Sequence, residues 1–336
     1  MSHSVQITDT SGNFIPSPLV IEINIVKSSK NLSDTASLNC IIFNFNQHII
    51  IKDPFDDDGN SENKLFKLYK RGQKIEIFLG YNDKLKLEFS GYIKEVKTDN
   101  EGMSIECEDG LFLFRNPVPN KVFKNTTIVE IVNYLIKNID PSFKLICDYN
   151  IGYEKFTIHK ADAIDVLQKI QEETSADVFF DTAKKELHIH GAYMYKSGEA
   201  FYSLQTNIES SSLEYKTAED RKIEMTVESV GTDGKTINYT TGTTGGERII
   251  KKVGRMSKSA IKVIADVEYK NRMSSSYVGS FDTWLIPYIE PGYTIGIDDE
   301  DYPEKDDLFY CESVTTNFSE NGGKRTVTPS IKLSGN

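Results

Sequence analysis

The chain has 336 residues, more than one ordinary hydrophobic core accommodates, so two or three domains are expected. Hydrophobic residues make up 38% and charged residues 26%, which excludes a disordered chain, and no apolar stretch approaches the roughly 20 residues of a membrane span. The 39 basic and 50 acidic residues give a net charge of −11 without a long basic cluster, so neither membrane insertion nor sequence-specific nucleic-acid binding is expected.

The first third of the chain has the alternation that is typical of β-strands. Apolar and polar residues alternate at 21–25, 74–77 and 105–108, a period that places one face of each strand on a core. Turn-forming residues, as at 56–60, separate these strands. Several short strands at this spacing predict an antiparallel barrel or sandwich, and we assign residues 1–118 to a first β-barrel.

The pattern changes to helical spacing near residue 120. Thr127 and Glu130 form a capping-box sequence, and apolar residues then recur at intervals of three and four until Asp140-Pro141 ends the helix. A second helix is expected from Asp162, with short strands between and after the two helices. Residues 119–203 therefore predict a small α+β domain.

Strands return in the last part of the chain. A helix is expected near 258–273, starting at Ser257, and the final strand contains Pro329. Because proline cannot donate a ladder hydrogen bond, we place that strand at a sheet edge. Residues 204–336 are assigned to a second barrel with a helical insertion. The predicted fold class is mainly β with an α+β insertion, in which two related antiparallel β-barrels flank a small α+β domain.

The two barrels are predicted to be distant copies of each other. Segments 72–77 and 292–297 both read Gly-x-x-Ile-x-Ile, and segments 92–98 and 310–316 both read Tyr-x-x-x-Val-x-Thr. From the glycine to the valine the separation is 24 residues in the first copy and 22 in the second. The alternative is that any two antiparallel meanders share such spacing.

We find no catalytic signature in the sequence. It contains no Gly-x-Ser-x-Gly elbow, no phosphate-binding lysine loop and no His-Glu-x-x-His. The four cysteines are far apart, which predicts neither a zinc site nor a disulfide framework, and no cofactor is expected. His188 and His190 share one strand face and would need a third ligand to bind a metal, so a solvated strand face is the preferred interpretation.

Two acidic segments also call for an interpretation. Asp53–Glu62 lacks the leading aspartate and the final glutamate of a calcium loop, so a turn is predicted there. A second acidic run lies in a hydrophilic connection between strands, where we expect a charged surface or lumen loop rather than paired catalytic carboxylates. The lumen-charge candidates in this run are Asp298, Asp299, Glu300 and Asp301.

Three parts of the sequence together resemble the hub proteins of phage tails. Segments 87–93 and 103–109 resemble the first-barrel signature of that family, and 123–131 resembles the start of its middle domain. Segments 279–295 and 322–325 resemble its second barrel. Their order and spacing cover nearly the whole chain, which is thus similar to the baseplate hubs of contractile tails and related injection systems, including late control protein D and the type VI spike hub.

The resemblance implies a structural protein without catalytic activity that forms a homotrimer. Three subunits with two barrels each would present six similar modules and join a three-fold central spike to a six-fold tail tube. The implied partners are a central spike protein, a tail tube protein and other baseplate proteins. The implied location is a virion tail or an injection particle, assembled in the host bacterial cytoplasm, and no spike is expected to be fused after residue 336.

Large aromatic side chains near the start of the second barrel are candidates for an interface. They are Phe281, Trp284 and Tyr288, for which core packing is the alternative. Two rival functions stay open. One is a carbohydrate-binding or adhesive tail-tip module, which would need exposed aromatic platforms, and the other is a cell-wall hydrolase with dispersed catalytic residues.

Overall fold

The computed structural model describes residues 2–41, 68–98, 102–218, 221–231 and 234–333. Within these residues the fold is mainly β, as predicted, with one 15-stranded sheet and three sheets of three strands each. The segment Asp53–Glu62, for which a turn was predicted, lies outside the described residues.

The described residues between 2 and 108 form what we call the first β unit. Its strands are β1 (Ser2–Thr8), β2 (Phe14–Ile15), β3 (Leu19–Ser28), β4 (Thr35–Ile41), β5 (Lys74–Tyr81), β6 (Lys84–Thr98) and β7 (Gly102–Glu108). They pair antiparallel in the order β3-β4-β7-β6-β5-β1-β2. The predicted alternation gives this unit most of its core, since Ile23, Ile25, Ile75, Ile77 and Ile105 are all buried in it. Ile21, where the alternation was predicted to begin, is instead 49% exposed, because the register of β3 against β4 shifts between Val20 and Glu22.

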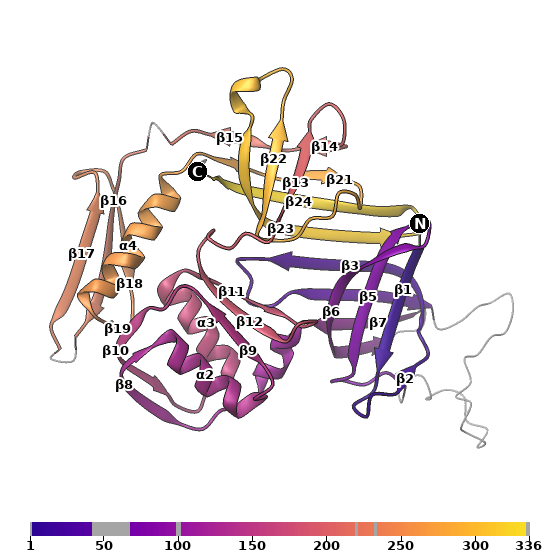
Figure 1. Cartoon of the computed structure of the whole chain (residues 1–336), viewed down its shortest axis with the longest axis horizontal. Helices are drawn as coiled ribbons and strands as arrows, with labels where there is room; N and C mark the ends of the chain where they lie inside the picture. Colours follow the sequence, from indigo (N-terminus) through magenta and orange to yellow (C-terminus); the bar gives the residue numbers. More distant parts are fainter. Residues whose placement is uncertain (1, 42–67, 99–101, 219–220, 232–233, 334–336) are drawn as a thin grey trace, which may run out of the picture.

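Residues 198–216 and 276–333 form the second β unit. Its strands are β13 (Gly198–Ser203), β14 (Ser210–Ser211), β15 (Glu214–Lys216), β20 (Ser276–Val278), β21 (Phe281–Thr283), β22 (Tyr293–Asp298), β23 (Asp307–Ser319) and β24 (Gly322–Lys332), with the short helix η3 (Pro303–Lys305) before β23. Strand β23 pairs with β24 and β22 and also antiparallel with β3. The two β units therefore share one continuous sheet, in which β3 and β23 lie side by side (Figure 1).

The α+β unit follows the first β unit and spans residues 110–191. It contains η2 (Gly110–Arg115), β8 (Lys121–Thr127), α2 (Ile128–Ile139), β9 (Lys144–Cys147), β10 (Gly152–Ile158), α3 (Ala163–Thr174), β11 (Ala176–Asp181) and β12 (Glu186–Gly191). Both predicted helices are confirmed. The Thr127 hydroxyl accepts the Glu130 amide at 3.4 Å, the Glu130 carboxylate accepts the Thr127 amide at 3.2 Å, and Asp162 is the N-cap of α3.

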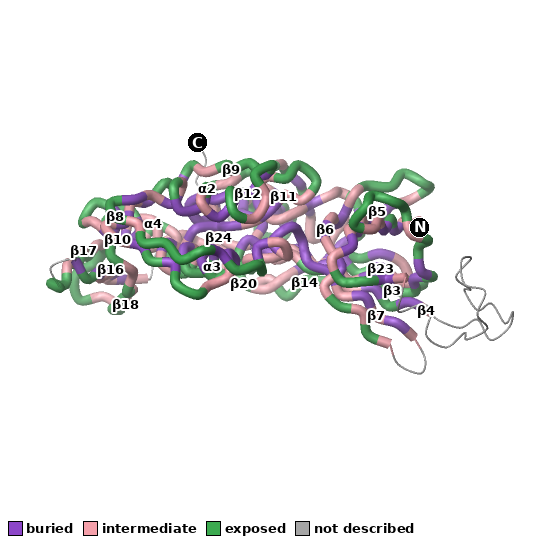
Figure 2. The backbone as a smooth tube through the Cα atoms, turned by 90° about the horizontal axis from the view of Figure 1, so that it is seen from below, coloured by how far each residue is buried: buried purple, intermediate pink, exposed green. Residues whose placement is uncertain are grey.

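Residues 221–272 form an outer unit beside the α+β unit. Strands β16 (Ile223–Val230), β17 (Thr236–Gly242) and β18 (Glu247–Lys252) make a sheet under α4 (Lys258–Arg272), and β19 (Arg255–Met256) pairs with β10. Met225, Ile261 and Ile264 belong to the same apolar core as α2 and α3. The helix predicted near 258–273 is thus present, but its apolar stripe packs with the α+β unit instead of extending a barrel. Buried stretches continue along the whole molecule (Figure 2).

The position of the last strand differs from the prediction. Strand β24 pairs with β23 on one side and with β21 and β20 on the other, so it is not an edge strand. Pro329 lies opposite Cys311, where the register of β23 is irregular. On the other side of β24, Pro329 lies between Val327, which pairs with β21, and Ile331, which pairs with β20. The missing amide therefore falls where the regular ladder is already interrupted.

The two segments with matched spacing also share backbone geometry. Gly72 and Gly292 both have a φ of +88°, a left-handed conformation that favours glycine. The Gly72 amide donates to the carbonyl of Ile93 at 2.8 Å, and the Gly292 amide donates to that of Cys311 at 3.0 Å. An irregularity in register follows each acceptor residue, in β6 and in β23. The runs β5-β6-β7 and β22-β23-β24 therefore correspond in more than residue spacing.

Candidate functional site

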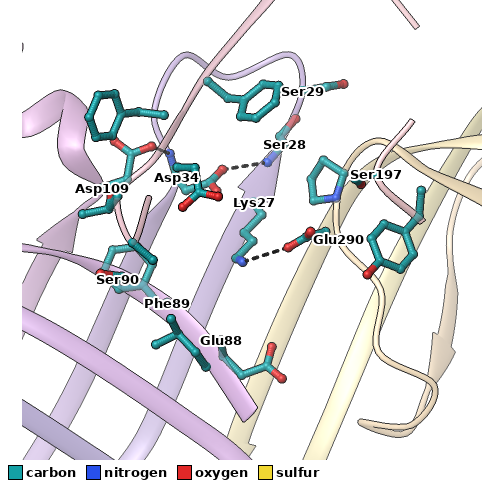
Figure 3. A pocket seen from close by; sticks show the side chains of 18 of the residues that line it. Lys27, Ser28, Ser29, Asp34, Glu88, Phe89, Ser90, Asp109, Ser197 and Glu290 are labelled. Atoms are coloured by element: carbon teal, nitrogen blue, oxygen red, sulfur yellow. Dashed lines mark hydrogen bonds and ion pairs between the residues drawn. The ribbon is translucent and has the colours of Figure 1, made fainter. Parts of the chain in front are cut away.

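The first β unit, the α+β unit and the second β unit meet around a cavity of about 380 Å³, which we call the junction cavity. Its lining comes from the end of β3, from β6, from the β11–β12 turn and from the loop before β22. Lys27 and Glu290 face each other from opposite sides, with 3.7 Å between the ammonium nitrogen and the nearer carboxylate oxygen (Figure 3). Asp34 and Asp109 lie together at another part of the wall (Figure 3).

These two aspartates cap backbone turns of the first β unit. The Asp34 carboxyl group accepts the Ser28 amide at 3.1 Å, and the Asp109 carboxyl group accepts the Asp34 amide at 3.1 Å. Burial raises the pKa of Asp34 to about 6. Burial, together with the charge of Asp34, also raises the pKa of Asp109 well above its usual range. Ionisation of this pair therefore opposes folding.

A buried ion pair joins the two β units beside the cavity. Arg325 of β24 donates to the Glu88 carboxylate of β6 at 2.6 Å and to the Ile289 carbonyl at 3.2 Å. The two charged side chains are 1% and 4% exposed, and the guanidinium also lies over the Tyr288 ring, 4.9 Å from its centroid. The folded protein tolerates the burial of each charge only because the opposite charge lies beside it.

This ion pair could not be predicted from the sequence. Glu88 and Arg325 are 237 residues apart, and no local pattern connects them. The one available signal was alternation: Arg325 occupies an inward position of β24, between the buried Gly323 and Val327. A cation at an inward strand position indicates a buried partner, but not which residue that partner is.

The histidine pair is buried, which corrects the prediction of a solvated strand face. His188 and His190 are 6% and 4% exposed, and their rings contact each other at 3.2 Å between Nδ1 and Nε2. Phe179 stacks on His188 with ring centroids 4.6 Å apart, and Tyr195 stacks on His190 at 4.7 Å. The segment after β12 folds back over this face, a long-range contact that alternation within β12 cannot reveal.

The three predicted interface residues lie in different environments. Phe281 is 1% exposed and packs in the core of the second β unit, so it is not available to a partner. Tyr288 lines the junction cavity, where the Lys86 ammonium group lies 3.2 Å from its ring centroid. Trp284 is 45% exposed, and its near neighbour Ile286 is 64% exposed. Of the three candidates, Trp284 presents an apolar surface to solvent.

The acidic run after β22 is more ordered than a solvated loop. Asp299 is 7% exposed, its amide donates to the Asp306 carboxylate at 2.7 Å, and its own carboxylate accepts the Asp301 amide at 3.1 Å. Asp298, Glu300 and Asp301 are exposed. Asp299 thus shapes the turn, while the other three place negative charge on its surface.

Metal-ligand clusters and membrane-spanning helices are both absent from the described residues. Among them, no group of three or more histidine, cysteine, aspartate or glutamate side chains is placed to hold a metal ion. No helix in the same part of the chain has the length and apolarity to cross a membrane. The polar groups of the junction cavity contact one another and the backbone. These contacts join the first β unit, the α+β unit and the second β unit.

Solved structures of tail proteins share this fold. A tail protein from Neisseria meningitidis MC58 matches with a TM-score of 0.66 at 13% identity, over 98% of this chain and 97% of its own. The 43 kDa tail protein of prophage MuSo2 from Shewanella oneidensis matches with a TM-score of 0.64 at 15% identity, over 98% of each chain.

A third similar structure comes from a secretion machine. It is an Escherichia coli protein described as a component of the type VI secretion system and as structurally similar to two T4 bacteriophage tail proteins. It matches with a TM-score of 0.61 at 12% identity, over 98% of this chain and 77% of its own. No family model and no curated protein matches the sequence. At these identities the likeness is one of fold.

Proposed function

We propose that this chain is a structural baseplate hub that forms a homotrimeric ring and joins a three-fold central spike to a six-fold tail tube. The fold supports this proposal, because two proteins described as tail proteins share it over nearly their whole length. Its partners would be a spike protein, a tube protein and other baseplate proteins. Assembly would take place in the host bacterial cytoplasm, without an enzymatic step.

The observation that carries the proposal is the repeated geometry of the two β units. Gly72 and Gly292 share their φ angle and their hydrogen bond to the long strand that follows. A chain with two such modules, repeated three times about an axis, offers six similar surfaces to a six-fold tube. A closed ring also leaves no free end on which further copies could add.

The connections between the two β units support a rigid ring. Strand β3 pairs with β23 from Ser28 to Glu22, and the Glu88–Arg325 pair crosses the same boundary. A hub that transmits force between spike and tube needs modules that keep a fixed orientation. A continuous sheet and a buried ion pair supply that constraint, because separating the units would expose strand edges and unpaired charge.

The charge of the chain favours a neutral to acidic passage. A basic wall would hold DNA through counterion release, whereas a tail must let its cargo pass. Exposed carboxylates at Asp298, Glu300 and Asp301 are the residues we place toward the lumen.

Cryo-electron microscopy of the protein bound to its spike tests this proposal. We expect a ring with three-fold symmetry in which the six β modules surround a central passage. Native mass measurements over a range of concentrations would report assembly of the free protein, which mass action makes concentration-dependent. A ring of another symmetry, or a passage lined by lysine and arginine, would contradict the proposal.

A further inference from the structure

We infer that the α+β unit and the adjoining outer unit form a binding site for one carboxylate group, the side chain of an aspartate or glutamate in a protein partner. The site is a cleft of about 320 Å³ between β10, α3 and the residues that begin β19. It shares no lining residue with the junction cavity, so the inference does not depend on the proposed hub role. The elements that form it lie together at the lower left of Figure 1.

Three cationic side chains form a row across the sheet of β19, β10 and β8, and two of them, Arg255 and Lys155, line this cleft. Lys155 of β10 is the register partner of Arg255 in β19 and of Lys124 in β8. Register partners on adjacent strands project to the same side, and like charges placed directly opposite each other destabilise a sheet. None of the three forms an ion pair with a residue that the structure describes. An anion in the cleft would relieve the repulsion between Lys155 and Arg255.

A helix adds a further cation to the same cleft. Lys169 of α3 lines it and lies 4.9 Å from the centroid of the Phe156 ring. Its ammonium group is 4.0 Å from the Glu173 carboxylate. Lys155, Lys169 and Arg255 thus surround a space that holds one acidic side chain, Glu173, in a protein whose net charge is −11.

The floor of the cleft carries a hydroxyl group without a hydrogen bond of regular geometry. The Tyr153 side chain is 2% exposed, and its hydroxyl lies beside the Glu173 carboxylate, which adds to burial in raising the pKa of Tyr153. Oε2 of Glu173 likewise has no hydrogen bond of regular geometry among the described residues. A buried hydroxyl without a well-formed hydrogen bond is costly, and a ligand oxygen in the cleft would accept from it in place of Glu173.

The surroundings favour a single carboxylate over a polyanion. Arginine and lysine bind carboxylates through charge-assisted hydrogen bonds, and the guanidinium fork matches the two carboxylate oxygens. Glu173 in the cleft and the excess of acidic residues in the chain repel a dianion or a nucleic-acid strand more strongly than one carboxylate. The partner chemistry is therefore an aspartate or glutamate side chain of a protein.

Fluorescence anisotropy with a labelled, capped peptide that contains a single aspartate tests the inference at low ionic strength. We expect the full-length Lys155→Gln/Arg255→Gln variant to bind the peptide at least about tenfold more weakly than wild type. Lys137→Gln removes an exposed cation of α2 outside the cleft and is the matched control, which should change the dissociation constant less than about twofold. Equal binding by the double variant, or an equal loss in the control, would overturn the inference.

Two further measurements separate a binding role from a structural one. Without peptide, the double variant should melt at the same temperature as wild type or higher, because like-charge repulsion is removed, whereas a structural role for the two cations predicts a lower melting temperature. Tyr153→Phe should weaken peptide binding severalfold without lowering the melting temperature of the free protein. Inorganic phosphate at matched ionic strength should compete weakly, and tighter binding of phosphate than of peptide would refute the carboxylate assignment.

Discussion

At the scale of single residues, buried carboxyl groups make the stability of this protein depend on pH. The pKa of Asp34 in the folded chain is raised to about 6 by burial, against 3.8 for a free side chain. A carboxyl group with a raised folded pKa favours folding while it is protonated. That contribution is present below about pH 4 and is lost as the pH rises through about 6.

Asp34→Asn should therefore stabilise the protein more at pH 7 than at pH 4. The asparagine keeps an acceptor for the Ser28 amide but cannot ionise. The difference in unfolding free energy between variant and wild type should grow across this range by about 1–3 kcal/mol, the size that a shift of this magnitude allows. Urea unfolding of both proteins at several pH values measures it, and a difference that does not vary with pH would refute the role of Asp34.

Asp9→Asn is the control, because the pKa of Asp9 is shifted in the opposite direction to the pKa of Asp34. Asp9 is exposed and accepts the Asn13 and Ser11 amides, and these hydrogen bonds, with that of Asn13 first, lower its pKa. Its contribution to stability is present above its usual pKa and is lost as the pH falls, so this substitution should not raise stability at neutral pH.

The buried His188 gives a second titration. Burial, and then the neighbouring His190, lower the pKa of His188 below the usual 6.5, although Glu186 acts in the opposite direction. The unfolded chain therefore takes up a proton more readily, and stability is lost as the pH falls through 6.5. His188→Gln should flatten the loss of stability between pH 7.5 and 5.5, while the exposed His159→Gln should leave it unchanged. An equally steep loss in His188→Gln would show that His188 is not responsible.

At the scale of elements, the Glu88–Arg325 pair should connect β6 to β24 energetically. Glu88→Gln leaves a buried guanidinium without its counter-charge and should cost about 3–5 kcal/mol of unfolding free energy. The double variant Glu88→Leu/Arg325→Met should recover most of this loss, because well-packed apolar side chains replace both charges. Chemical denaturation of the single and double variants gives the unfolding free energies for a double-mutant cycle. Additive changes in these free energies would show that the pair is not coupled.

The helices could be predicted from sequence because their signals are local. The capping box of Thr127 and Glu130, the N-cap Asp162 and the N-cap Ser257 all act within one turn, and the structure contains a helix after each. Strand alternation likewise identified most inward residues of the first β unit, but not the irregularity in β3 that leaves Ile21 exposed. Secondary structure followed from the sequence wherever one turn or one strand contained the information.

What was not predicted depends on contacts between distant segments. Pro329 indicated an edge strand, yet β21 and β20 cover β24 on either side of that residue. The face of His188 and His190 is buried by a segment that folds back on it. The row of Arg255, Lys155 and Lys124 spans strands far apart in sequence. Patterns within one segment do not report which other segment covers it.

At the scale of the whole molecule, exposed apolar side chains are the features that assembly would cover. Trp284 and Ile286 are 45% and 64% exposed and lie in the connection between β21 and β22. The same connection contacts the first β unit, since the Leu285 amide donates to the Tyr81 hydroxyl at 3.4 Å. An exposed tryptophan beside an exposed isoleucine, held against a rigid sheet, has the character of an interface anchor.

If the proposed trimer uses this surface, Trp284→Ser/Ile286→Ser should abolish trimer formation without changing the stability of the monomer. Both side chains already face solvent, so their loss removes little from the core, while burial in an interface would be worth about 2 kcal/mol or more for the tryptophan. Sedimentation of both proteins bound to the spike at matched concentrations measures assembly, and thermal unfolding at low concentration measures monomer stability. Phe14→Ser provides the control, because Phe14 is 78% exposed on β2, outside this connection. A trimer that survives the double substitution, or is lost equally in the control, would place the subunit interface on another surface.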